Sequence, residues 1–192
     1  MRLILASASP RRAELLRMAG IQFDVMVADA DETPEPGEQP EDYVCRVARK
    51  KVAAVAVQIP RQPVLGADTV VMVDGKVFGK PVDEEDARRM LGVLSGRTHT
   101  VITGVCLADP GAQDGAFRTA LARTDVEFAQ LSRADIAWYV ATGEPADKAG
   151  AYAIQGLASR FVTRIDGSYS NVVGLPVALV YGLCRNTGLL VS

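Results

Sequence analysis

A carboxylate inside an apolar run is the first residue in this sequence whose type suggests chemistry. The segment "LGADTVV" spans residues 65–71, and its charged side chain is that of Asp68. A buried carboxylate is costly unless it is paired, hydrogen-bonded or bound to a metal ion. Asp68 is therefore either a cap for a neighbouring loop or a functional group, a general base or metal ligand, with the Thr69 hydroxyl beside it as a donor.

A second candidate is the stretch "SASPRR", which begins at Ser7 and follows the apolar run "LILA". Ser9 is expected to be the N-cap and Pro10 the first residue of a helix, so that Arg11 and Arg12 fall in its first turn. Cations are unfavourable there, because the first-turn amides and the helix dipole already present positive charge. The stretch indicates either a bound anion such as phosphate, held by amides, hydroxyls and a guanidinium, or an ordinary helix start with two solvated arginines.

Further charged residues could complete such a site. The acidic loop "ADADETPEPGEQPED", residues 28–42, is a surface segment by composition, and one or two of its carboxylates could be metal ligands. The acids considered are Asp29, Asp31 and Glu32, and the lysines are Lys51, Lys80 and Lys148. A single lysine is most often only a solubilising charge. Because the sequence has no His or Cys cluster, a metal here would be a hard, oxygen-bound cation such as Mg²⁺ or Mn²⁺.

Several familiar motifs are excluded. The segment "GKVFGKP" is one residue short of a P-loop, and Pro81 stands where a Ser or Thr would hold magnesium. The single histidine, His99, would have to serve any serine triad, but the chain contains no G-x-S-x-G elbow. His99 is expected to be an exposed histidine on a strand. The remaining candidates indicate a metal-dependent site for a phosphorylated small molecule.

Hydrophobic periodicity and turn residues predict the elements that position these residues. Strands are expected at 3–6, 23–27, 63–73 (broken at Gly66 and Asp68), 76–81, 98–108, 117–129, 151–156 and 161–165, with a hairpin turn at Asp74-Gly75. Helices are expected at 10–19, from Tyr43 to Val55, from Asp83 to Gly96, within 132–143 behind a capping box, and from Pro176 toward Gly188. This order predicts an α/β protein with long antiparallel pairs and no regular βαβ series.

The bulk composition limits the class of protein. The chain has 192 residues, 48% hydrophobic and 23% charged, with a formal net charge of −2, which predicts one domain, 1–192, and no general affinity for nucleic acid. Cys45, Cys106 and Cys184 lie far apart and form no CxxC pair, which argues against disulfides and zinc and favours a reducing cytoplasm. We expect no signal peptide and no membrane span.

Seven blocks of the sequence, in order, resemble one known family. They are "LILASASPRRAELLRMAGIQFDV", "ARKKVAAV", "VLGADTVV", "GKVFGKP", "LSGRTHTVITGV", "EPADKAGAYAIQG" and "IDGSYSNVVGLPV". Together they resemble the Maf family of nucleoside triphosphate pyrophosphatases nearly end to end. The resemblance implies an α/β domain of the inosine-triphosphatase-like fold, with a mixed sheet and two lobes around a cleft. It also implies hydrolysis between the α and β phosphates, which yields a nucleoside monophosphate and pyrophosphate.

The resemblance also implies roles for individual residues. Asp68 matches the family's proton acceptor, and Glu32 matches a further acidic residue, so that the two are the expected ligands of a divalent cation, Mg²⁺ or Mn²⁺. Ser7, Arg11, Lys51 and Lys80 match phosphate-binding positions, and Arg12 is not counted among them. A homodimer is what the family suggests.

The block "DKAGAYAIQG" resembles the branch of the family that acts on dTTP and UTP. Gln155, with Arg11 and Thr69, matches the positions that go with this substrate choice. A carboxamide can donate to the O4 and accept from the N3–H of a pyrimidine. The alternatives are the branch that acts on 7-methyl-GTP, a nucleotide-binding regulator of cell division that would not need Asp68, and a phosphatase that releases inorganic phosphate from monophosphates.

Overall fold

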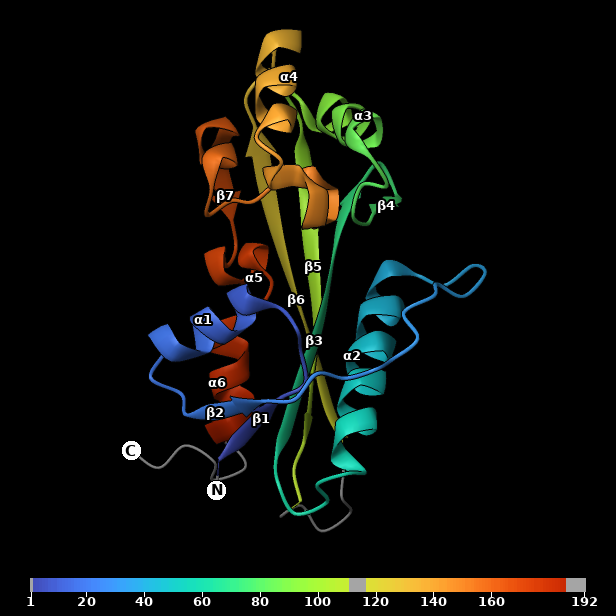
Figure 1. The fold of residues 1–192 in the computed structure, drawn as a ribbon, viewed down its shortest axis with the longest axis vertical. Helices are drawn as coiled ribbons and strands as arrows, with labels where there is room; N and C mark the ends of the chain where they lie inside the picture. Colours follow the sequence, from blue (N-terminus) through green and yellow to red (C-terminus); the bar gives the residue numbers. More distant parts are fainter. Residues whose placement is uncertain (1, 111–116, 186–192) are drawn as a thin grey trace. The chain divides into compact units, whose positions relative to one another are not determined.

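The structure is a computed structural model that describes residues 2–110 and 117–185 (Figure 1). Its strands are β1 (Leu3–Leu5), β2 (Phe23–Val25), β3 (Val64–Val73), β4 (Lys76–Phe78), β5 (Thr98–Ala108), β6 (Phe117–Phe128) and β7 (Val162–Asp166). Its α-helices are α1 (Pro10–Met18), α2 (Pro40–Ala56), α3 (Glu84–Leu94), α4 (Arg133–Ala141), α5 (Tyr169–Val173) and α6 (Val177–Arg185). Three short 3-10 helices, η1 (Glu144–Asp147), η2 (Ala149–Ala151) and η3 (Leu157–Phe161), lie between α4 and β7.

The strands form one mixed sheet in the order β2-β1-β3-β5-β6-β7, with β4 paired to β3. Strand β1 is parallel to both β2 and β3, whereas β3–β4 and β6–β7 are antiparallel. The expected mixed α/β fold is therefore confirmed. The expected break at Gly66 and Asp68 is wrong, since β3 runs through both residues.

The chain divides into two compact units, which are described separately. The first comprises Met1–Asp68, Thr103–Ala122 and Gly174–Ser192, and the second comprises Thr69–Ile102 and Arg123–Val173. The prediction of one domain over 1–192, with two lobes around a cleft, stays a prediction.

In the first unit, Figure 1 shows α2 on one side of the strands and α1 with α6 on the other. The apolar face of α2 is buried as its periodicity predicts, and Ala48, Val52 and Val55 pack in one cluster with Ile4 and Val64 of neighbouring strands. The helix begins at Pro40 rather than Tyr43, because Pro40 is compatible with the first helical turn and acidic residues follow it there.

The core of the second unit is built around aromatic rings and His99. This histidine is only 2% exposed, and its ring packs edge-to-face against Phe128 and Tyr152, with centroids 5.0 and 5.3 Å away. Its Nε2 lies 2.8 Å from the Tyr152 hydroxyl oxygen. The expectation of an exposed histidine is therefore wrong. Side chains alternate across a strand, and position 99 shares the buried face of β5 with Val101.

The segment 151–156 is not the expected strand. Gly150 and Ala151 have positive φ values of 71° and 60°, which turn the chain out of any extended path, and the 3-10 helices η2 and η3 flank the segment. Helix α5 was not expected either. The last helix is described to Arg185, so its expected continuation toward Gly188 lies outside the described residues.

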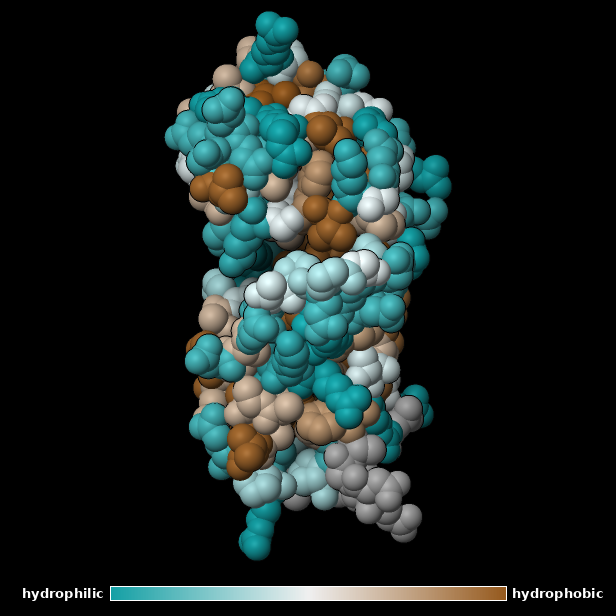
Figure 2. Space-filling model, turned by 90° about the vertical axis from the view of Figure 1, so that its right-hand side faces the viewer, coloured by the Kyte–Doolittle hydropathy of each residue, from teal (hydrophilic) through white to brown (hydrophobic). Residues whose placement is uncertain are grey.

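The surface is mixed in character. In Figure 2 hydrophilic side chains (teal) predominate, and apolar ones (brown) occur between them. Large exposed apolar residues come from several elements, among them Met18 of α1, Val77 of β4 and Trp138 of α4. Within the described residues, no helix is long and apolar enough to cross a membrane.

Candidate active site

An ammonium group joined to two carboxylates forms the centre of the candidate site, in the first unit. Lys51 Nζ lies 2.8 Å from Asp68 Oδ1 and 2.9 Å from Glu32 Oε1. Lys51 and Asp68 are 8% and 7% exposed, whereas Glu32 lies on the exposed acidic loop. The costly carboxylate within β3 is thus compensated by a cation from α2, seventeen positions earlier in the sequence.

The position of Lys51 is set by close contact between α2 and two adjacent strands. A Cβ added to Gly66 of β3 would lie 2.7 Å from Val52 Cγ2 and 2.9 Å from the carbonyl oxygen of Ala48. One added to Gly104 of β5 would lie 2.5 Å from the carbonyl of Val44. Real Cβ atoms do not approach backbone this closely, so any larger residue would push α2 away from the sheet.

The start of α1 contributes polar groups of the expected kind. Pro10 is at the first helical position and Ser9 is the N-cap residue, although the Ser9 side chain makes no capping hydrogen bond. The Ser7 Oγ accepts hydrogen bonds from the Ser9 amide (3.1 Å) and from Arg12 Nη1 (3.4 Å). Arg12 Nε donates to the Gly174 carbonyl at 2.8 Å. These bonds hold the Ser7 hydroxyl and the Arg12 guanidinium in fixed orientations.

Burial and neighbouring charges shift the pKa values of this cluster. Burial raises the pKa of Asp68, and Glu32 adds to this, whereas Lys51 and Arg12 oppose it. Burial lowers the pKa of Arg12, although Asp68 and Glu32 favour its charged form. Burial raises the pKa of Tyr43 to about 12, together with Asp68 and Glu32. A carboxylate whose proton affinity is raised by burial is a better proton acceptor near neutral pH.

The structure brings together Glu32, Lys51 and Asp68, and it adds two residues that sequence reasoning did not assign to the site. Arg12 is not among the expected phosphate-binding residues, yet it interacts electrostatically with both carboxylates. Tyr43 donates its hydroxyl to the Glu32 carbonyl at 2.9 Å. Two arginines in the first turn of one helix are a sequence signal that could have placed Arg12 in the site. Nothing in the sequence indicated that Tyr43 belongs to it.

The other expected site residues lie in both units and differ in how exposed they are. Arg11 is half-buried in α1 beside Arg12. The remaining three, Thr69, Lys80 and Gln155, belong to the second unit, where Lys80 and Gln155 are exposed and Thr69 is half-buried. Their participation in the site stays a prediction.

The residues present fit a hard divalent cation. Lys51 contacts one oxygen of each carboxylate, and Mg²⁺ typically binds through one or two carboxylates together with substrate phosphates. Within 2–110 and 117–185, no group of three or more His, Cys, Asp or Glu side chains could hold a metal ion by itself. A cation at Glu32 and Asp68 would therefore depend on oxygens from a ligand.

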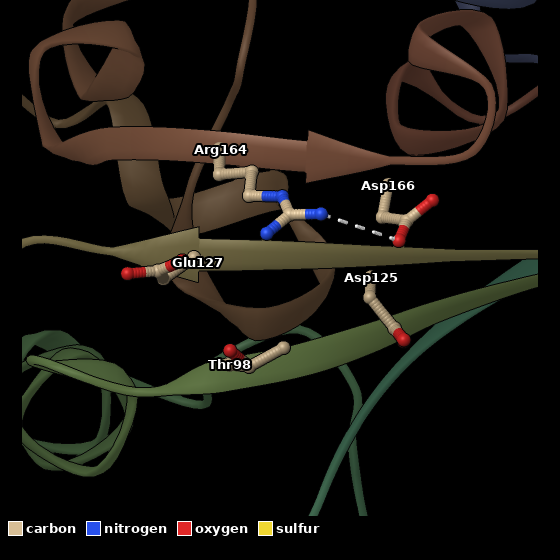
Figure 3. A pocket seen from close by; sticks show the side chains of 5 residues that line it. All are labelled: Thr98, Asp125, Glu127, Arg164 and Asp166. Carbon is tan, nitrogen blue, oxygen red and sulfur yellow. Dashed lines mark ion pairs between the residues drawn. The ribbon is translucent and has the colours of Figure 1, made fainter.

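A small polar pocket in the second unit has a structural explanation. Figure 3 shows Thr98 from β5, Asp125 and Glu127 from β6, and Arg164 and Asp166 from β7 around it. In the register of β6 and β7, Asp125 pairs with Asp166 and Glu127 with Arg164. All five are exposed, while Val126 and Phe128 on β6 point into the core. The pocket is the solvated face of this part of the sheet.

A family model and the curated relatives of this chain agree on one family. The family model described as "Maf-like protein" matches residues 2–187. A dTTP/UTP pyrophosphatase of Anaeromyxobacter dehalogenans (strain 2CP-C) is 55% identical over 187 residues, 97% of this chain and 94% of that protein. A dTTP/UTP pyrophosphatase of Koribacter versatilis is 53% identical over 190 residues (99% and 96%), and one of Geobacter sulfurreducens is 52% identical over 189 residues (98% and 98%).

Solved structures similar to this chain are more distant. The Staphylococcus aureus Ham1 protein matches with a TM-score of 0.48 and 15% identity, over 67% of this chain and 72% of that one. A nucleoside-triphosphatase described as a dITP/XTP pyrophosphatase, from Mycobacterium abscessus, matches with a TM-score of 0.41 and 18% identity, over 68% and 76%.

Proposed function

Because the chain belongs to the Maf family, we propose that it is a nucleoside triphosphate pyrophosphatase that hydrolyses dTTP and UTP. The products are the nucleoside monophosphate and pyrophosphate. Full-length identity of more than 50% to three dTTP/UTP pyrophosphatases supports this substrate choice. The observation that carries the catalytic part of the proposal is the buried Lys51–Asp68 pair with Glu32 beside it.

In the proposed reaction Asp68 acts as the general base. A water molecule attacks the α-phosphorus, its proton passes to the Asp68 carboxylate, and the bond to the bridging oxygen breaks so that pyrophosphate leaves. Lys51 opposes the effect of burial by favouring the charged form of Asp68 and, as a cation, attracts the phosphate chain. Enzymes that hydrolyse phosphoanhydrides act largely by positioning the reacting groups and neutralising their charge. A pre-formed cluster of charged side chains can do both.

Glu32 and Asp68 are the proposed ligands of Mg²⁺ or Mn²⁺, with substrate phosphates completing the coordination. When bound, the cation supplies positive charge that stabilises the leaving pyrophosphate. Phosphate oxygens are bound by Ser7, Arg11, Lys51 and Lys80. The fixed orientation of the Ser7 hydroxyl supports its part of this role, and Arg12 is added to the set because it donates to Ser7.

The base is selected by Gln155, with Arg11 and Thr69. An amide side chain presents a donor and an acceptor side by side, which matches O4 and N3–H of uracil or thymine. The purines present a different edge, so their complexes leave polar groups without partners. Such mismatches discriminate strongly, and we expect a preference over GTP of at least ~100-fold.

One set of incubations tests the proposal. We expect kcat/KM values for dTTP and UTP to exceed those for CTP, GTP and 7-methyl-GTP, with Mg²⁺ or Mn²⁺ present, and anion-exchange chromatography to show pyrophosphate. If 7-methyl-GTP is the best substrate, the roles of Gln155 and its partners are wrong. Release of inorganic phosphate from monophosphates would indicate a phosphatase, and stoichiometric binding without turnover would indicate a regulator.

The cellular setting follows from the activity. We propose that the enzyme acts in the cytoplasm, where it removes surplus or non-standard pyrimidine nucleotides before a polymerase uses them. A homodimer remains a prediction that the arrangement of the single chain does not address.

A further inference from the structure

The segment that carries Gln155 is held by one buried tyrosine and one carboxylate, and this contact lies wholly within the second unit. It comprises residues 153–158, in the orange turns between α4 and β7 of Figure 1. The Tyr139 hydroxyl accepts a hydrogen bond from the Ala153 amide at 3.1 Å. The Glu144 Oε2 accepts from the Leu157 amide at 3.0 Å. The two bonds hold the backbone two residues before and two residues after Gln155.

Tyr139 and Glu144 are also bonded to each other. The Tyr139 hydroxyl donates to Glu144 Oε1 at 2.7 Å, and the same oxygen lies 3.4 Å from the Ala158 amide. Tyr139 is fully buried in α4, so the hydroxyl has a fixed position. The carboxylate accepts from two backbone amides at the amino end of η3, which have no partner within that helix. The pair is thus a rigid support rather than a chance surface contact.

Gly156 leaves room for this carboxylate. A Cβ at position 156 would overlap the Glu144 carboxylate, with Cδ 2.5 Å and Oε1 2.6 Å away. The φ of Gly156 is −106°, outside the left-handed region that favours glycine, and the space that a side chain would need is occupied by the Glu144 carboxylate. Gly156 also donates its amide to the Ala153 carbonyl at 3.0 Å, which closes the turn around Gln155.

We propose that Tyr139 and Glu144, with Gly156, are positioning residues for base recognition, which fix the backbone of Gln155 while its side chain stays exposed. This inference rests on the proposed role of Gln155. An exposed carboxamide has several rotatable bonds, and it can discriminate between bases only if its backbone does not move. A displacement of about 1 Å is enough to cost a large part of such selectivity.

Two variants disturb the support from opposite sides. Glu144→Gln keeps the shape of the side chain but replaces one acceptor oxygen by an NH₂ group. This group would face the Leu157 amide or the Tyr139 hydroxyl, both of which are donors, so one hydrogen bond is lost. Gly156→Ala keeps every polar group and displaces the carboxylate by steric overlap. For each we expect the ratio of kcat/KM for UTP over GTP to fall about tenfold, mainly through a higher KM for UTP. Glu144→Ala should lower the ratio further than Glu144→Gln.

The controls separate positioning from general destabilisation. Glu84→Gln in α3 removes an exposed glutamate that pairs with Arg88, and Gly92→Ala adds a methyl group where nothing lies within 4 Å. Both should leave the UTP/GTP ratio unchanged. Ser132→Ala removes the capping box of α4, the helix that carries Tyr139, and should lower the melting temperature while the ratio stays within twofold of wild type.

The outcomes distinguish the two proposals. If wild type hydrolyses neither dTTP nor UTP, or shows no base preference, the proposed function fails. If wild type is selective and Gln155→Ala loses selectivity, but Glu144→Gln and folded Gly156→Ala keep the wild-type ratio, the positioning inference is overturned and the proposed function stands. A fall in the ratio for both variants at unchanged pyrophosphate stoichiometry supports the inference.

Discussion

His99 makes the second unit sensitive to mild acid, and the effect can be calculated. Burial lowers the pKa of this histidine from 6.5 to about 4, although Asp125 partly favours the charged form. The unfolded chain therefore binds a proton between pH 6.5 and 4, while the folded chain does not. Because the unfolded state binds more protons in this window, the free energy of unfolding falls as the pH falls through it.

The size of the loss follows from the pKa difference. Each pKa unit corresponds to about 1.4 kcal/mol, so lowering the pH from 7 to 5 should cost roughly 2 kcal/mol of stability. Below pH 4 the folded protein is protonated too and the loss levels off. Since His99 is the single histidine, no other imidazole contributes to the window. The raised pKa of Asp68 acts in the opposite direction, so the comparison needs a variant.

The assay is urea unfolding of wild type and His99→Phe at pH 7 and pH 5, followed by the fluorescence of Trp138. This is the single tryptophan of the chain, and it lies in the same unit as His99. The variant loses the bond to Tyr152 and will be less stable at pH 7, but its loss between pH 7 and 5 should be smaller than that of wild type by roughly 2 kcal/mol. Equal losses in the two proteins would mean that His99 titrates normally and that its burial has no electrostatic consequence.

Two further predictions concern the reaction itself. Asp68→Asn should lower kcat at least ~100-fold with an unchanged far-ultraviolet circular dichroism spectrum, because an amide cannot accept the proton of the attacking water. If this variant keeps more than a tenth of the wild-type rate, the base is Glu32. Excess EDTA should abolish pyrophosphate release, and Mg²⁺ or Mn²⁺ added beyond the chelator should restore it. Glu32 and Asp68 are too few ligands to retain the cation against a chelator, since no third acidic, His or Cys side chain joins them among the described residues. Full activity in EDTA would contradict the metal-dependent mechanism.

The sequence predicted most elements but few of their contacts. Capping residues are local signals, so the helices that start after Asp83 and Ser132 were predicted and are confirmed, with both caps in place. The partner of Asp68 was not predictable from spacing, since Lys51 reaches it through the packing of a helix against the sheet. For the proposed site, residue types and their spacing indicated which residues were candidates. The resemblance to the family indicated the role of each one.

Two of the errors in the sequence predictions have different origins. His99 was judged by its polarity, although the alternation of β5 places it in the core. The run 151–156 was judged by its apolar pattern, although left-handed residues at 150 and 151 and a distant carboxylate at 144 determine its path. The alternation at His99 is a local pattern that a short window contains, whereas the path of 151–156 depends on a contact with Glu144 that such a window does not contain.

The contact of α2 with Gly66 and Gly104 also bears on how the protein tolerates mutation. A larger side chain in a core can be offset by a smaller neighbouring side chain. Where two backbones are in contact, no such compensation is available. Substitutions at Val47, Val52 or Val55 that keep the side-chain volume are therefore expected to leave Lys51 in place relative to Asp68. Gly66 and Gly104 tolerate substitution less well. A single added methyl group at either position would overlap α2 and move the Lys51 ammonium away from the Asp68 carboxylate.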